Sequence, residues 1–185
     1  MAILTSATYL KALRHRGPHA GKDFNVSGEI VVASGGSIAL TDVIYIVRLG
    51  ENQRPVRLRL KWTPLSGTPV LTNPAFDVGV IADTSATYTR FDGTTYPVIP
   101  TDADILSADL TLDADNMATD VEVPRPVLDA VSNYGPYIIT LTPSGAGAFS
   151  VAGGSGQLSL QVATMGEEKP NALVYTDYIN TKVSN

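Results

Sequence analysis

An Asp-Thr-Ser triplet is the part of the chain whose residue types come closest to a catalytic motif. Asp83-Thr84-Ser85 follows an apolar segment that ends at Ala82, and aspartic proteases present their carboxylate on such a turn. These enzymes need two carboxylates that share one proton, from a second copy of the turn or from a dimer, and here a dimer would supply the second. The later segment Tyr137–Leu141 lacks the apolar-apolar-Gly ending that braces this turn in retroviral-type enzymes. We therefore interpret Asp83 as part of an ordinary hairpin or loop turn.

Histidine and cysteine are too scarce for most other catalytic chemistry. The only histidines are His15 and His19, and the sequence has no cysteine. A serine triad needs a histidine base, and thiolate or imidazole metal sites need several Cys or His ligands. No Gly-x-Ser-x-Gly elbow and no glycine-rich phosphate loop is present. We expect no catalytic residue, no resident metal and no cofactor, and so a protein that is not an enzyme.

A run of carboxylates between Asp102 and Asp120 offers oxygen ligands of the kind that calcium prefers. An EF-hand loop that began at Asp113 would need Gly at its sixth position and Glu at its twelfth, but those positions hold Ala118 and Pro124. A solvated acidic face is the preferred interpretation, and a weak cation site between loops stays open. The cluster consists of Asp102, Asp104, Asp109, Asp113, Asp115, Asn116 and Asp120.

The segment Pro55–Trp62 alternates between apolar and cationic side chains, as only a strand would place them on two faces. One face carries Val56, Leu58, Leu60 and Trp62, and the other carries Arg57, Arg59 and Lys61. We expect the cationic face to meet solvent or an acidic partner. Trp62 lies on the opposite face from these cations and the chain's pI is about 4.9, so nucleic acid is not an expected partner.

Charge is unevenly distributed along the chain. Residues 1–61 carry nine Lys or Arg and four acids (9 − 4 = +5), whereas the rest carry four and 14 (4 − 14 = −10). A basic cluster surrounds Gly17-Pro18, and we interpret residues 1–24 as an N-terminal arm with a short helix over Ser6–Leu13. Its candidate protein-contact residues are Lys11, Arg14, Arg16 and Lys22.

Residues 25–185 are expected to form one domain with a C-terminal tail. The chain has 16 Gly and 12 Pro, and the absence of a long amphipathic helix favours an all-β fold, a jelly roll or β-sandwich with an extended N-terminal arm. No leader-like start and no run of about 18 apolar residues is present, so we expect neither export nor membrane spanning. Strands are predicted at Glu29–Ala33, Asp42–Leu49, Pro55–Trp62, Ala75–Ala82, Tyr137–Thr142 and Gln157–Thr164.

Four kinds of connection are predicted between these strands. Asp92-Gly93 indicates a hairpin, and the Pro and Gly residues of Thr63–Pro69 predict a loop. Glycine-rich turns are expected at 34–37 and 153–156. A capping Thr and an acidic first turn predict a short helix over Thr101–Ala108.

Several of these segments resemble a known family. The runs Ser27–Ile30, Asp42–Gly50, Pro55–Leu60 and Phe76–Val80 are similar to the head decoration, or cement, proteins of tailed bacteriophages. In that family a strand ending in Arg-Leu, a short polar turn, a second strand and an Asp-Val-Gly-Val strand form much of a jelly roll. The likeness covers roughly residues 27–110, and it includes the acidic segment where a short helix is expected.

The resemblance implies a structural virion protein on the outside of a phage capsid, assembled in the host cytoplasm. It would bridge subunits of the major capsid protein and associate with itself as a homodimer or homotrimer. The arm would reach the shell or a neighbour, and Arg57, Arg59 and Lys61 would meet an acidic surface. Two other classes stay open: a phage neck, tail or fibre-associated module, and a carbohydrate-binding β-sandwich, for which the tyrosines of the last third are suited.

Overall fold

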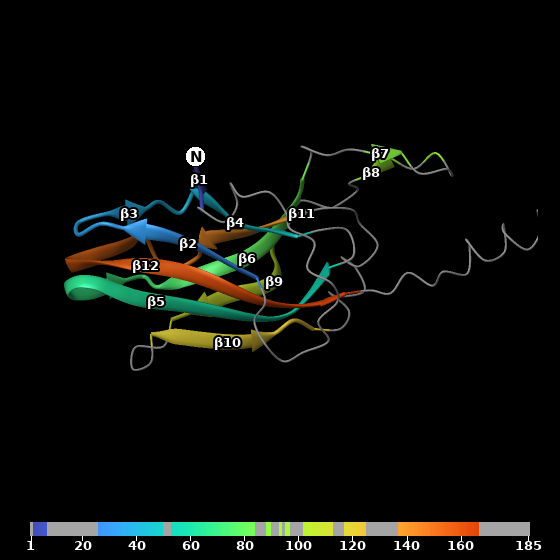
Figure 1. The fold of residues 1–185 in the computed structure, drawn as a ribbon. Helices are drawn as coiled ribbons and strands as arrows, with labels where there is room; N and C mark the ends of the chain where they lie inside the picture. Colours follow the sequence, from blue (N-terminus) through green and yellow to red (C-terminus); the bar gives the residue numbers. More distant parts are fainter. Residues whose placement is uncertain are drawn as a thin grey trace, which may run out of the picture.

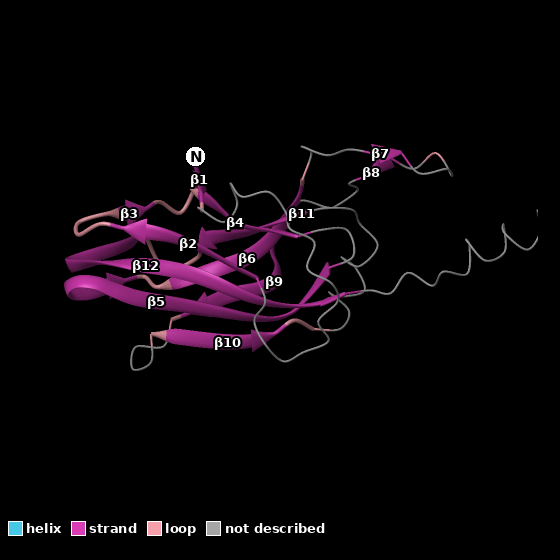
Figure 2. Cartoon of the chain, viewed as in Figure 1, coloured by secondary structure: helices cyan, strands magenta, loops and turns pink. Residues whose placement is uncertain are grey.

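The computed structural model describes residues 2–6, 26–49, 53–83, 88–89, 93, 95–96, 102–112, 117–124 and 137–166. Every described element is a strand (Figure 2). The strands are β1 (Ile3–Thr5), β2 (Val26–Val32), β3 (Ser37–Ile38), β4 (Val43–Leu49), β5 (Gln53–Thr72), β6 (Ala75–Ala82), β7 (Tyr88–Thr89), β8 (Thr95–Tyr96), β9 (Asp102–Thr111), β10 (Ala118–Glu122), β11 (Tyr137–Pro143) and β12 (Phe149–Gly166).

Two sheets lie one against the other, which confirms the predicted all-β sandwich (Figure 1). One sheet has the order β1-β4-β11-β6-β9, and the other has the order β10-β5-β12-β2 with β3 paired to β12. The described pairings are antiparallel except that of β1 with β4. The hairpin predicted at Asp92-Gly93 is confirmed, because β7 pairs with β8 around it.

The core between the sheets contains the apolar faces that the alternating segments predict. Leu58, Leu60 and Trp62 of β5 are fully buried. The ring of Phe149 lies 5.9 Å from that of Trp62 and 5.1 Å from that of Phe76, so aromatic contacts join the two sheets. Val56 departs from the prediction: it is only half-buried, because a register shift beside Ala163 inserts one extra residue in β5.

Strand β5 is much longer than predicted. The expected loop at Thr63–Pro69 is wrong, because β5 runs without interruption from Gln53 to Thr72 and pairs with β12 throughout. The expected turn at 153–156 likewise lies inside β12. Gly67 and Gly153 have φ of 64° and 74°, and the register shifts between Ala152 and Gly156. Here glycine bends two paired strands together at a corner, and it does not end them.

The helix predicted over Thr101–Ala108 is also wrong. This segment belongs to β9, which pairs with β6 and buries Leu106 and Leu110. Pairing with a neighbouring strand outweighs the local helix signals, since helix propensity is weak beside tertiary packing. The helix expected over Ser6–Leu13 falls, after Ser6, outside the described residues, as does most of the predicted 1–24 arm.

The remaining strand predictions are confirmed, and so is the turn at 34–37, where Gly35 has φ of 76°. Strand β4 is covered on both faces over much of its length: Ile44, Ile46, Val47 and Leu49 are buried in it, while Tyr45 is half-buried.

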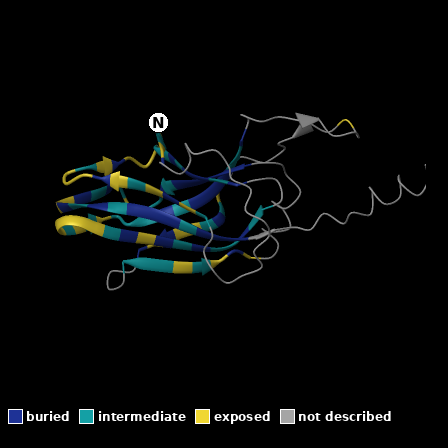
Figure 3. Ribbon diagram, in the orientation of Figure 1, coloured by how far each residue is buried: buried dark blue, intermediate teal, exposed yellow. Residues whose placement is uncertain are grey.

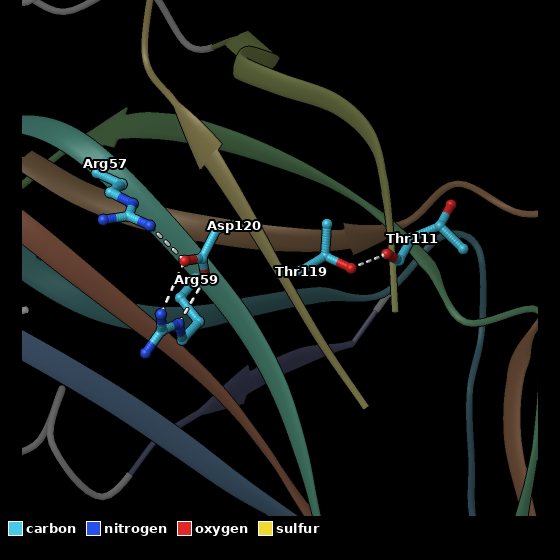
Figure 4. Close-up of polar contacts among 5 residues, drawn as sticks. All are labelled: Arg57, Arg59, Thr111, Thr119 and Asp120. Carbon is cyan, nitrogen blue, oxygen red and sulfur yellow. Dashed lines mark hydrogen bonds and ion pairs between the residues drawn. The ribbon is translucent and has the colours of Figure 1, made fainter. Parts of the chain in front are cut away.

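Close contacts hold the two sheets together along both sides. At one side a Cβ added to Gly28 of β2 would lie 1.8 Å from the carbonyl oxygen of Ile46 in β4. At the other side the hydroxyl of Thr119 in β10 donates to the carbonyl oxygen of Thr111 in β9 (Figure 4). Among the described residues no helix meets the length and apolarity needed to cross a bilayer.

Candidate protein-contact surface

The outward side chains of β10, β5, β12 and β2 form one polar surface, called here the outer face. Residues directly opposite one another in antiparallel strands share a face. Arg57 is paired with Glu122, Arg59 with Asp120, and Lys61 with Ala118. Across β5 from β10, the strand β12 adds Gln157, Ser159 and Gln161 to the same face, and β2 adds Ser27 and Glu29.

Asp120 binds two of the three cations predicted to form a contact site. Its Oδ2 accepts from Arg57 Nη2 at 2.6 Å and from Arg59 Nη2 at 2.8 Å, and its Oδ1 accepts from Arg59 Nε at 2.5 Å (Figure 4). The hydrogen bonds and charge of Arg59, followed by those of Arg57, hold the pKa of the Asp120 carboxyl below its usual range. The same pair raises the pKa of Arg59. An acidic partner for these arginines therefore lies within their own chain.

Lys61 differs from the two arginines. It is exposed, and its strand neighbours on the outer face are Ala118 and Ser159, with Glu29 beyond Ser159. The outer face holds three cations on β5 and three carboxylates, those of Asp120, Glu122 and Glu29, so its described charges balance (3 − 3 = 0). Of the three predicted cations on β5, Lys61 is the one best placed to meet another molecule.

The acidic side of this face escaped the sequence analysis. Asp120 lies 61 residues from Arg59 in the sequence, and its sequence neighbours place it in the acidic cluster that begins at Asp102. A usable signal was present, since Asp120 and Glu122 alternate with Val121 as a short strand would place them.

Three exposed apolar side chains lie on β5 and β2 near the bend of β5 and β12, and Figure 3 shows this end of the sandwich as largely exposed. Leu65 and Val70 flank Gly67 on β5 and are 53% and 62% exposed. Val31 of β2, 67% exposed, lies in register with Gln157 and, through it, with Thr63. We call Val31, Leu65 and Val70 the apolar corner. The local sequence does not reveal this corner, because the Pro and Gly residues around Leu65 are typical of a loop.

The other candidate sites are dispersed. Asp83 is buried, and its Oδ2 lies 2.7 Å from Arg48 Nε in an ion pair, while Thr84 and Ser85 lie outside the described residues. Within the described part of the chain, no three His, Cys, Asp or Glu side chains gather as a metal site would need. The arm residues Lys11, Arg14, Arg16 and Lys22 lie outside the described residues.

Comparisons with known proteins give no family. No protein-family model matches the chain, and no curated protein matches it. Among solved structures, the capsid of Ralstonia phage GP4 is similar at a TM-score of 0.49 and 13% identity, over 90% of this chain and 99% of that one. The cyanophage Pam1 capsid asymmetric unit gives 0.37 and 14%, over 84% and 94%. The g-type lysozyme inhibitor PliG of Aeromonas hydrophila gives 0.32 and 15%, over 88% and 98%.

Proposed function

We propose that this chain is a structural virion protein that binds the outer surface of a phage capsid and bridges subunits of the major capsid protein. The observation that carries the proposal is the resemblance of residues 27–110 to phage decoration proteins. A β-sandwich with a balanced polar outer face and an exposed apolar corner is consistent with such a role, because both offer surface for contact with another protein.

The physical effect follows from preferential binding. A protein that binds only the expanded shell stabilises that shell by mass action, as any ligand stabilises the state it prefers. A copy that touches two capsid subunits, or copies that also touch one another, bind more tightly than one contact allows. Three surfaces are proposed to take part: the arm cations Lys11, Arg14, Arg16 and Lys22, the cation Lys61 of the outer face, and the apolar corner.

The test is co-sedimentation of the purified protein with expanded, decoration-free capsids of the phage that encodes it. A truncation that starts at Asp23 would also remove β1, which pairs with β4. The better arm variant therefore replaces Lys11, Arg14, Arg16 and Lys22 by Gln and keeps the chain length. We expect saturable binding at many copies per particle, weaker binding by the arm variant, and a higher capsid melting temperature with the wild-type protein.

Two outcomes would contradict the proposal. Failure to bind any form of the shell would exclude a cement role. Binding at only a few copies per particle, counted by quantitative mass spectrometry, would favour a neck or tail module.

A further inference from the structure

The short strand β1 sits on the edge of β4 in the parallel orientation. Its three residues are in register with Val43, Ile44 and Tyr45. The flanking backbone extends the pairing, because Val43 N–H donates to the carbonyl of Ala2 at 3.1 Å and Ser6 N–H donates to that of Tyr45 at 3.0 Å. The segment Ala2–Ser6 thus lies along β4 as a peptide lies along a sheet edge.

Side chains fix both ends of this segment. At its start, Asp42 Oδ1 accepts the N–H of Ala2 at 2.7 Å and Oδ2 accepts that of Ala39 at 3.2 Å, and these bonds lower the pKa of Asp42. At its end, Ser6 is fully buried, and its Oγ donates to the carbonyl of Ile46 at 2.6 Å. Between them Leu4 packs against the core. The edge of β4 therefore forms a binding site for this segment, with a fixed register.

The contacts that hold β1 are confined to this binding site on the edge of β4. Ile3 and Thr5 point to solvent, and the bonds above come from β4 and from the turn that precedes it. A three-residue strand with one side chain against the core is expected to detach at low free energy. A second molecule's Ala2–Ser6 segment would make the same contacts as the chain's own.

The connection that follows β1 is longer than the fold requires. Strand β2 begins at Val26 and passes directly against β4, as the approach of Gly28 to Ile46 shows. Nineteen residues, 7–25, join Ser6 to Val26, whereas connections between neighbouring elements usually take about 4 to 6 residues. At about 3.3 Å per residue a chain of this length spans up to roughly 60 Å. It is therefore long enough to reach a neighbouring copy.

We propose that the edge of β4 is a strand-acceptor site whose partner is the Ala2–Ser6 segment of a second copy of this chain. Exchange replaces each chain's own β1 by its neighbour's without loss of a hydrogen bond. It is favoured when the concentration of neighbouring chains exceeds the effective concentration of the tethered segment, which for tethered segments in general can be of millimolar order. The inference stands apart from the capsid proposal, and it is tested without capsids.

The test uses disulfide trapping between full-length chains, because the native sequence has no cysteine. Residues 3 and 43 are directly paired, and neighbouring strands lie within the Cα separation that a disulfide spans. Ile3→Cys chains are mixed with size-tagged Val43→Cys chains at rising concentration, oxidised mildly and separated on a non-reducing gel. The matched control replaces the second chain by a tagged Val31→Cys chain, whose cysteine is exposed on the other sheet.

Strand exchange predicts a mixed disulfide between the Ile3→Cys and Val43→Cys chains that exceeds the Val31→Cys control at least fivefold and increases with concentration. The double variant Ile3→Cys/Val43→Cys tests whether β1 pairs with the edge of β4 at all. If it closes within one chain while the mixed pair stays at the control level up to millimolar concentration, exchange is excluded. If the double variant forms no disulfide at all, the pairing of β1 with β4 is excluded, and the proposal is excluded with it.

Discussion

Asp120 is the residue on which the charge balance of the outer face depends. Its carboxylate binds both Arg57 and Arg59, so these guanidinium groups, on the same face of β5, do not simply repel one another. Without Asp120 the face would carry three cations against two carboxylates (3 − 2 = +1), and a net positive face favours acidic partners.

We predict that Asp120→Asn lowers the free energy of unfolding at pH 7 by about 1 kcal/mol, the upper range for exposed ion pairs. Because the arginines hold the pKa of Asp120 below its usual value, the folded state stabilises the charged form. The contribution is therefore complete above the unfolded pKa of about 4, and it is lost as the pH falls through the lower, folded value. Urea unfolding of both proteins between pH 2 and pH 7 measures this difference.

The control for this prediction is Glu122→Gln, which removes the next outward carboxylate of β10. Its effect on stability is expected to be smaller. A difference between wild type and Asp120→Asn that persists undiminished at the lowest pH would contradict the electrostatic explanation.

At the scale of elements, Gly28 sets how closely the two sheets approach at one side of the sandwich. A methyl group there would lie 1.8 Å from the oxygen of Ile46 and 2.6 Å from its carbonyl carbon. Both are backbone atoms, so no side chain can rotate away. We predict that Gly28→Ala costs roughly 2–3 kcal/mol, as overpacking of a filled core does. The neighbouring exposed Ser27→Ala should stay within about 0.5 kcal/mol.

Denaturant unfolding with an unchanged m-value measures both variants. Equal stability of Gly28→Ala and wild type would mean that the sheets lie farther apart than the structure has them.

The strands that could be predicted from the sequence are those whose own residues show a strand pattern, without reference to a partner strand. Leu58, Leu60 and Trp62 alternate with cations, and that period alone identifies a strand with one buried face. The bent part of β5 and the strand β9 could not be predicted this way, because their local signals are those of a loop and a helix. Each becomes a strand through a partner distant in sequence, β12 for the first and β6 for the second.

The same distinction applies to the candidate site. Arg57, Arg59 and Lys61 were placed correctly on one face by their spacing. That two of them would bind Asp120 depends on the pairing of β10 with β5, which no local pattern specifies. The apolar corner depends in turn on a bend produced by paired glycines of two strands. The sequence therefore predicts which side chains share one face of a strand, whereas pairing between distant strands decides which of these faces lie side by side.

At the scale of the whole molecule, two kinds of surface compete as the main contact with a partner. The outer face is balanced in charge, so little net attraction is expected from it beyond Lys61. The apolar corner exposes Val31, Leu65 and Val70, which stabilise the isolated fold little because they are already in water. Burial of such side chains against a partner contributes roughly 25 cal/mol per Å².

We therefore predict that the variant Val31→Thr/Leu65→Ser/Val70→Thr binds expanded capsids at least about tenfold more weakly, a loss of about 1.4 kcal/mol, with its melting temperature unchanged. Thr72→Ala, exposed on the same strand, is the matched control and should bind normally. Lys61→Gln should have a small effect that disappears at high salt, because screening removes exposed charge contacts. If Lys61→Gln abolished binding while the corner variant bound normally, the partner would instead be held by charge on the outer face.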